Sequence, residues 1–248
     1  MTASDGRRPA AEGRSSRRPL AVVTGGTRGI GLACSARLVR DGYDVIAAAR
    51  GPAAGPLPDG VRHAACDVAD PEAVRHLFAG LEGLRAVVLA AGIAGGDPDP
   101  PDEGFWRRMM AVNLDGAWRC AEAAAPLLPD GEGRILFLAS VLGLRAVPDQ
   151  VAYSAAKHGV IGLMRALALR LAPRGITVNA LCPGWVDTAM ARARWAELHM
   201  SAADAAAGTP TRRITTAEEV ADMAGHLLSP AARNVTGQAI ALDGGAAI

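Results

Sequence analysis

The sequence predicts an α/β fold in which one doubly wound parallel sheet of about seven strands carries helices on both faces. Short apolar segments alternate along the chain with longer segments of helical periodicity, and a glycine-rich segment follows the first apolar one. Such alternation produces parallel strands joined by right-handed crossovers. No internal repeat or second domain breaks the pattern over 248 residues, so a single domain is expected.

Composition narrows the function classes. The net charge of +1 favours neither a nucleic acid nor an anionic membrane as partner, and no apolar run approaches the ~20 residues of a membrane helix. The four cysteines form no CxxC pair and lie at no metal-ligand spacing from a histidine. We therefore expect no metal site and a reduced, cytoplasmic setting. The cysteines are Cys34, Cys66, Cys120 and Cys182.

The N-terminal segment differs from the rest. Residues 1–18 are rich in Ser, Gly, Pro and Arg, which predicts a disordered basic tail. A solvated arm is favoured over an anion-binding role. The folded domain is expected over residues 19–248.

The first folded unit is a strand, a glycine loop and a helix. Residues 20–24 form an apolar strand, residues 25–31 read GGTRGIG, and a helical pattern continues to residue 40. Glycines allow close backbone approach, and a helix N-terminus attracts negative charge, so the unit suits a pyrophosphate. The spacing is Gly-x3-Gly-x-Gly. This Rossmann-type unit predicts a dinucleotide cofactor.

The second strand, residues 43–49, indicates which dinucleotide. An acid at its carboxyl end would hold a ribose 2′-hydroxyl, whereas a basic residue accommodates a 2′-phosphate. The strand ends at Arg50, Arg28 lies in the glycine loop, and Asp44 lies at the wrong end. These features favour NADP(H) over NAD(H). The alternative is that both arginines are ordinary surface residues of an Arg-rich protein.

The middle of the chain continues the alternation. The Pro- and Gly-rich residues 51–60 predict a loop, and strand 61–66 leads to Asp67, which can accept a hydrogen bond from an adenine amine. A helix over 71–81, a strand over 85–90 and a small-residue corner at Ala90-Ala91-Gly92 follow. An acidic, Pro-rich loop covers 95–101.

The second half carries the candidate catalytic side chains. A long helix over 103–128 has Asn113 in its interior, and strand 134–139 ends at Ser140. Catalytic groups of open α/β sheets lie at that edge. A helix over 150–172 is followed by strand 176–181, Pro183-Gly184, a variable stretch to residue 216, a helix over 217–228 and a strand over 239–242.

Tyr153 and Lys157 form a pair on the helix over 150–172. Lys157 is the only lysine among 26 Lys and Arg residues, and Tyr153 is one of two tyrosines. A spacing of four places both side chains on one helical face. An ammonium lowers the pKa of a neighbouring phenol, so the pair predicts a tuned proton donor. The alternative is a surface tyrosine beside a chance lysine.

Together these residues resemble the short-chain dehydrogenase/reductase family over essentially the whole chain after residue 18. Asn113, Ser140, Tyr153 and Lys157 match its catalytic four, and within the family the chain looks most like 3-oxoacyl-thioester reductases and aromatic-polyketide ketoreductases. One departure is Ala90, where the family has Asn. The resemblance implies cofactor contacts from Thr24, Gly25, Thr27, Arg28, Gly29, Ile30, Gly31, Arg50, Asp67, Val68, Ala91, Gly92, Tyr153, Lys157, Pro183, Gly184, Val186 and Thr188.

The resemblance also implies a function. It implies NADPH-dependent reduction of a β-keto acyl or polyketide-type ketone to a secondary alcohol. The alternatives are NAD(P)-dependent oxidation of another secondary alcohol and a catalytically silent dinucleotide-sensing or partner-binding protein. Residues 185–213 would contact the substrate, or simply pack as a lid, through Trp185, Met190, Trp195 and Met200.

The resemblance further suggests a homotetramer, or a homodimer. The helices over 103–128 and 150–172 would form one interface and the C-terminal segment another. The sequence alone shows only long, Ala-rich apolar helices, which are equally compatible with burial inside one chain.

Overall fold

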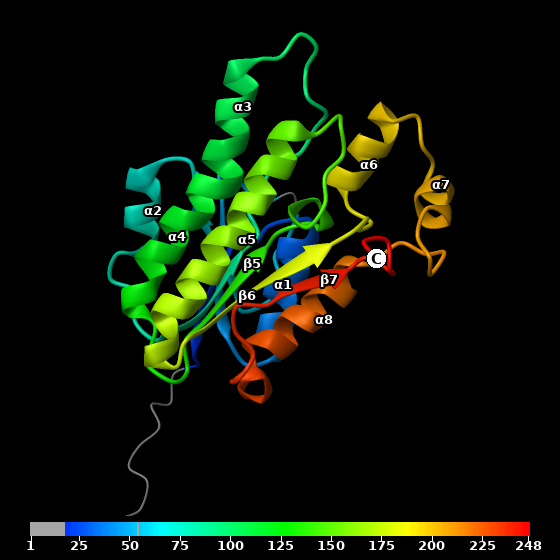
Figure 1. Cartoon of the computed structure of the whole chain (residues 1–248). Helices are drawn as coiled ribbons and strands as arrows, with labels where there is room; N and C mark the ends of the chain where they lie inside the picture. Colours follow the sequence, from blue (N-terminus) through cyan, green and yellow to red (C-terminus); the bar gives the residue numbers. More distant parts are fainter. Residues whose placement is uncertain (1–17, 54) are drawn as a thin grey trace, which may run out of the picture.

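The sheet is parallel throughout and has seven strands in the order β3-β2-β1-β4-β5-β6-β7. The computed structural model describes residues 18–53 and 55–248, so the predicted basic tail falls almost entirely outside the described residues. The predicted fold class is confirmed (Figure 1). The strands are β1 Leu20–Thr24, β2 Asp44–Ala49, β3 Val61–Ala65, β4 Leu84–Leu89, β5 Arg134–Leu138, β6 Thr177–Pro183 and β7 Ala239–Leu242.

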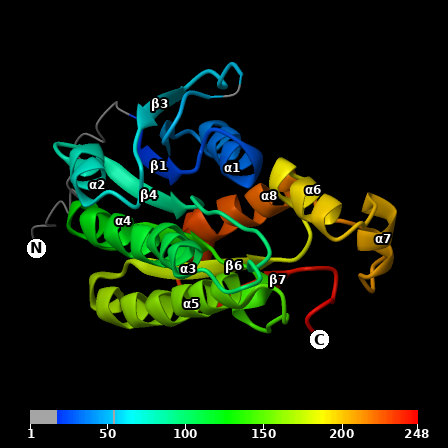
Figure 2. The ribbon, with the colours of Figure 1, turned by 90° about the horizontal axis from the view of Figure 1, so that it is seen from above.

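Helices cover both faces of this sheet (Figure 2). Helices α2, α4 and α5 lie on one face, and α1 and α8 lie on the other. Side chains alternate between faces along a strand, so Val22 packs in the first core cluster and Val23 in the second. The helices are α1 Gly29–Arg40, α2 Pro71–Phe78, α3 Glu103–Met110, α4 Gly116–Ala124, α5 Val151–Leu171, α6 Ala189–Glu197, α7 Ala202–Ala207 and α8 Ala217–Leu228.

The strand order indicates where a ligand would bind. The chain moves outward from β1 through β2 to β3 and then returns to add β4 on the other side of β1. Ligands of open α/β sheets bind at such a reversal, outside the carboxyl ends of the strands. The glycine loop after β1 and the Ala90-Ala91-Gly92 corner after β4 both lie there. None of the helices in the described part of the chain is long and apolar enough to cross a membrane.

Two helical features differ from the expectation. The predicted helix over 103–128 is divided: a π-helical turn, Ala111–Asp115, separates α3 from α4 and contains Asn113. Helices α6 and α7 lie within the stretch up to residue 216 for which the sequence predicted no element. The helical pattern was missed because both helices are short and present only a small apolar face. Thr188 caps α6, and Ser201 forms a capping box at α7.

Candidate active site

Where the strand order reverses, hydrogen bonds join the carboxyl ends of β1 and β4. The Ala90 backbone N–H donates to the carbonyl of Thr24 at 3.2 Å, and the Ala91 N–H donates to the Thr24 hydroxyl oxygen, also at 3.2 Å. Thr24 is buried. The corner that lacks the family's asparagine is therefore tied to the glycine loop through Thr24 and the backbone.

The glycine loop is shaped for close approach by a ligand. A Cβ on Gly31 would lie 2.2 Å from the Gly25 carbonyl oxygen, and Gly25 adopts a φ of +67°. Ser35 fixes the loop by donating its hydroxyl to the carbonyls of Gly26 and Gly31, at 3.1 and 3.0 Å. Helix α1 begins at Gly29 with no side-chain cap, which leaves its first N–H groups available to an anion. These residues fit a pyrophosphate. The role of Ser35 in fixing the loop was not predicted from the sequence.

The expected ribose and adenine contacts lie along the same edge. Arg28, in the glycine loop, and Arg50, after β2, are both exposed, whereas Asp44 begins β2 at the opposite end of the strand. The Asp67 carboxylate accepts the Ala69 N–H at 3.0 Å in the turn after β3. Val68 is buried in the core, so its side chain packs inward and only its backbone remains for a cofactor contact.

Asn113 fixes the segment after β4. Its amide nitrogen donates to the Ile93 carbonyl at 3.0 Å, and its amide oxygen accepts the Ile93 N–H at 3.1 Å. The Asn113 amide also donates to the Met109 sulfur at 2.8 Å. A Cβ on Gly92 would lie 2.8 Å from the Asn113 amide oxygen and 3.9 Å from the Lys157 ammonium nitrogen. Asn113, Gly92 and Lys157 are thus neighbours, and π-helical turns are frequent at functional sites.

Ser140, Tyr153 and Lys157 come together across β5 and α5. The Ser140 hydroxyl oxygen accepts the Leu142 N–H at 3.1 Å and lies close enough to the Tyr153 phenol to favour its ionised form. The Lys157 ammonium donates to the Leu138 carbonyl at 2.8 Å and lies 5.5 Å from the centroid of the Tyr153 ring. Cation–π attraction operates over this distance. The predicted serine, tyrosine and lysine therefore form one cluster.

Burial dominates the protonation of this cluster. It raises the pKa of Tyr153 to about 12, an effect only partly offset by the neighbouring Ser140 side chain. Burial also lowers the pKa of Lys157 to about 8, and the nearby Cys182 thiol opposes that change. The expectation that Lys157 brings the pKa of Tyr153 below its ordinary value is wrong for this structure. Desolvation disfavours the Tyr153 phenolate more than the Ser140 hydroxyl favours it, and it disfavours the Lys157 ammonium more than Cys182 favours it.

The segment after β6 extends over the site. Gly184 packs against Asp243, since a Cβ on Gly184 would lie 2.9 Å from the Asp243 Cβ. Thr188 caps α6 by accepting the Ala191 N–H at 3.3 Å, and its methyl carbon lies 3.5 Å from the position of a Gly29 Cβ. Pro183 and Val186 are buried. The segment 183–188 therefore meets the glycine loop at the carboxyl ends of the strands.

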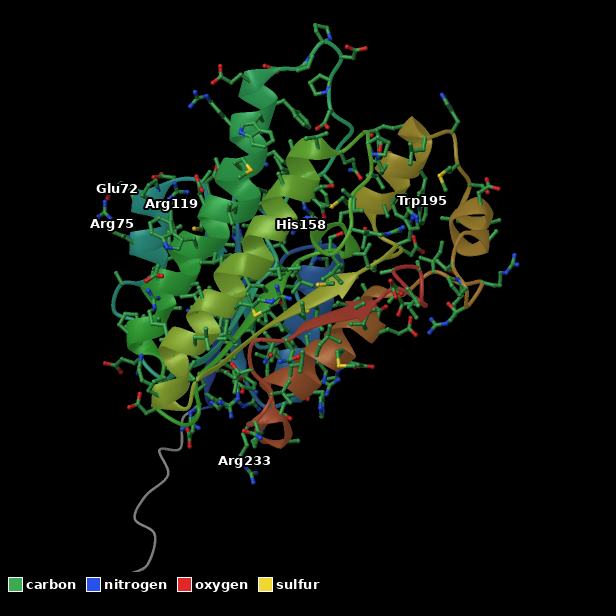
Figure 3. All side chains as sticks on the ribbon, viewed as in Figure 1. Glu72, Arg75, Arg119, His158, Trp195 and Arg233 are labelled. Carbon is green, nitrogen blue, oxygen red and sulfur yellow. The ribbon has the colours of Figure 1, made fainter. Side chains whose placement is uncertain are left out.

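The expected substrate-contact residues divide into two groups. Trp185, Trp195 and Met200 pack in one small cluster, in which the Trp185 and Trp195 rings meet edge to face at 5.8 Å. Trp195 belongs to α6, its side chain lies on the side of α6 that faces α7 (Figure 3), and it is only 4% exposed. Met190 is exposed. Packing within the lid thus explains three of the four residues.

The fold and the site together indicate a class of protein. A parallel sheet with a glycine loop where its strand order reverses is typical of dinucleotide-binding proteins, and the Tyr153–Lys157 pair at the same edge suits a proton donor. In the described part of the chain, no group of three or more His, Cys, Asp or Glu side chains is placed to hold a metal ion.

Comparison with known proteins gives the family. The sequence model described as enoyl-(acyl carrier protein) reductase matches residues 25–247. The chain is 35% identical to the 3-oxoacyl-[acyl-carrier-protein] reductase MabA of Mycobacterium tuberculosis, covering 98% of this chain and 97% of that protein. It is 36% identical to a putative ketoacyl reductase of Streptomyces coelicolor, covering 91% and 96%. The chain belongs to the short-chain dehydrogenase/reductase family and is an oxidoreductase that uses NAD(P).

Solved structures agree with this membership. A variant of actinorhodin polyketide ketoreductase with NADPH superposes with a TM-score of 0.85 at 33% identity, covering 93% of this chain and 97% of that one. Both the predicted fold and the predicted family are confirmed.

Proposed function

We propose that the protein reduces a ketone of a β-keto acyl or polyketide-type substrate to a secondary alcohol, with NADPH as cofactor. The observation that carries the proposal is the Ser140–Tyr153–Lys157 cluster at the carboxyl edge of β5, beside the glycine loop. The similarity to MabA and to actinorhodin polyketide ketoreductase supports this substrate class. We assign catalysis to Asn113, Ser140, Tyr153 and Lys157.

The chain's own residues manage the substrate oxygen. NADPH, when bound, supplies the hydride that the carbonyl carbon takes up. Tyr153 donates its phenol proton to the carbonyl oxygen, which completes the alcohol. The Ser140 hydroxyl polarises the same oxygen by donating a hydrogen bond to it. A raised pKa keeps Tyr153 protonated at neutral pH, which suits a proton donor in the reductive direction.

Lys157 and Asn113 support the proton donor. The Lys157 ammonium lies beside the Tyr153 ring and would stabilise the phenolate left after proton transfer. It would also hold the hydroxyls of the nicotinamide ribose. Asn113 holds the Ile93 backbone and, as a neighbour of Lys157, would anchor a water that returns a proton.

Cofactor binding is assigned to the carboxyl edge of the sheet. The glycine loop would receive the pyrophosphate, and segment 183–188 the nicotinamide carboxamide. Asp67 would receive the adenine amine. Arg28 and Arg50 would meet the 2′-phosphate, and the lack of an acid after β2 favours NADPH over NADH.

Arg50→Asp is expected to reverse the cofactor preference. The new carboxylate would repel the 2′-phosphate of NADPH, whereas it could still accept a hydrogen bond from the ribose 2′-hydroxyl of NADH. The Kd for NADPH should therefore rise roughly 10- to 100-fold. Fluorescence titration of both cofactors against wild type and variant measures this. Tighter binding of NADH than of NADPH by the wild type would refute the assignment.

NADPH affinity is expected to fall as pH rises through about 8. Because the pKa of Lys157 is lowered to about 8, its ammonium is present below that pH and lost above it. The Kd for NADPH should then rise roughly threefold to tenfold between pH 7 and 9.5. In Lys157→Met the same titration should stay flat, and a flat wild-type profile would contradict the role of Lys157.

A panel of ketones tests the reaction itself. NADPH consumption is expected with β-keto thioesters and polycyclic ketones. Turnover confined to another secondary alcohol with NAD(P) would favour the oxidative alternative. Binding of NADPH without turnover of any substrate would favour the sensing alternative.

We also propose that the protein assembles as a homotetramer, or a homodimer, in the cytoplasm. Leu169 on α5 is 80% exposed and Trp118 on α4 is 47% exposed, so both helices present apolar side chains outward. All four cysteines are buried and unpaired, which suits a reduced compartment. Light scattering in solution measures the number of chains per particle.

A further inference from the structure

The guanidinium of Arg194 is buried where three distant segments meet. Arg194 lies on α6 and is 8% exposed. It donates through Nη2 to the carboxylate of Asp149, just before α5, and through Nη1 to Glu197 at 2.6 Å. A buried charge is tolerated only when it is paired, so these contacts specify where α6 sits.

The third segment is the loop after β4. A Cβ on Gly96 would lie 2.7 Å from Nη1 of Arg194, so the guanidinium rests directly on the Gly96 backbone. The Gly96 N–H also donates to the Glu197 carboxylate at 3.4 Å. Helix α6 is thus joined to this loop as well as to Asp149, and a side chain at Gly96 would displace the guanidinium.

The same loop caps the helix that carries Tyr153. The Asp97 carboxylate accepts the backbone N–H groups of Val151 and Ala152, the latter at 3.3 Å. Gln150, at the N-cap position of α5, provides no side-chain cap of its own. Instead its amide donates to the Gly95 carbonyl at 3.2 Å. The first N–H groups of a helix have no partner within the helix and need acceptors from elsewhere. Residues 95–97 provide such contacts at the start of α5.

A backbone contact completes the connection. The Asp97 N–H donates to the carbonyl of Asp149 at 2.9 Å, so the loop after β4 is joined to the segment before α5. Arg194 binds the side chain of that same Asp149. Tyr153 lies in the first turn of α5, immediately beyond the capped residues. Figure 1 shows α6 next to the end of α5 where this turn lies.

We propose that Arg194 is a positioning residue for the reaction. By joining α6 to the two segments that fix the start of α5, Arg194 makes the placement of the Tyr153 hydroxyl depend on the seating of α6. The inference rests on the proposed function, in which Tyr153 donates the proton. The position of α6 and the placement of the Tyr153 hydroxyl for proton donation are then coupled.

Two substitutions test the junction from its two sides. Arg194→Gln removes the buried positive charge, and Asp149→Asn removes the negative charge of its half-exposed partner. Each should lower kcat roughly 10- to 100-fold, because a displacement of about 1 Å at a reacting group costs up to about 100-fold. The KM for the ketone and the Kd for NADPH should change less than threefold. Arg194→Lys keeps the charge but loses the two-armed geometry, so it should recover part of the kcat.

The matched control is Arg192→Gln. Arg192 lies on the same helix but pairs with Asp187 in an exposed ion pair at 2.9 Å. Its loss should leave kcat and KM within twofold of wild type, since exposed pairs contribute little. The double variant of Arg194→Gln and Asp149→Asn should lose no more kcat than the worse single variant, because both disrupt the same Arg194–Asp149 ion pair.

Several results would overturn the proposal. A raised KM with unchanged kcat would mean that α6 only retains the substrate. A lowered melting temperature with wild-type kcat in the folded fraction would mean a purely structural ion pair. If Arg194→Gln does not fold, Asp149→Asn decides by the same criteria. Wild-type turnover by Tyr153→Phe would instead refute the proposed function, so the two failures are distinguishable.

Discussion

Tyr153→Phe is expected to lose about 10²- to 10⁴-fold in kcat for ketone reduction while retaining NADPH affinity within about threefold. The substitution removes only the phenol oxygen, and with it the proton that general acid catalysis supplies. The aromatic ring that lies 5.5 Å from the Lys157 ammonium is kept. Steady-state kinetics with saturating NADPH, together with fluorescence titration of the cofactor, measures both quantities.

The chain offers a matched control in Tyr43, its second tyrosine. Tyr43 precedes β2 at the opposite edge of the sheet, is half-buried, and also has a pKa raised by burial. Tyr43→Phe removes the same atom from a similar environment and should leave kcat within twofold of wild type. An equal loss of kcat in both variants would show that the effect of Tyr153→Phe comes from general destabilisation rather than from catalysis.

Gly31→Ala is expected to raise the Kd for NADPH roughly 10- to 100-fold. A Cβ at this position would lie 2.2 Å from the Gly25 carbonyl oxygen, so the loop must move. Relieving such a clash costs about 1–3 kcal/mol, and each 1.4 kcal/mol is tenfold in affinity. Cofactor titration measures the loss, and thermal melting measures the accompanying destabilisation.

Gly162→Ala is the control for that substitution. Gly162 lies on the exposed side of α5, and a Cβ there meets nothing within 4 Å. Alanine is a better helix former than glycine by about 0.5–1 kcal/mol, so this variant should keep its NADPH affinity and melt a few degrees higher. Unchanged NADPH affinity in Gly31→Ala would show that the glycine loop does not hold the pyrophosphate.

Much of the site was predictable because its signals are local. The glycine loop follows a strand and opens a helix, so residues 20–40 alone indicate a nucleotide site. Ser140 follows an apolar strand, and a spacing of four on a helix brings Tyr153 and Lys157 to one face. Period and residue type are sufficient for such inferences, because each feature depends on neighbours within one or two turns of chain.

Other features depended on contacts between distant segments. The Ser35 hydroxyl looks like any helical serine until the fold places it against the carbonyls of Gly26 and Gly31. Arg194 is one of many arginines in the sequence, and only packing buries it beside Asp149. The π-helical turn at Asn113 adapts a helix to the segment after β4, which helical periodicity cannot indicate.

The sequence by itself determined the doubly wound sheet and the order of its elements, because hydrophobic periodicity and short motifs specify local structure and topology. The four residues assigned to catalysis came from the resemblance of those motifs to the short-chain dehydrogenase/reductase family. Only the tertiary structure decided the protonation of the pair. The pKa of Tyr153 rises to about 12, against the direction expected from its spacing to Lys157, and the pKa of Lys157 falls to about 8. Desolvation depends on how completely distant segments exclude water from a side chain, and neither residue type nor spacing measures that.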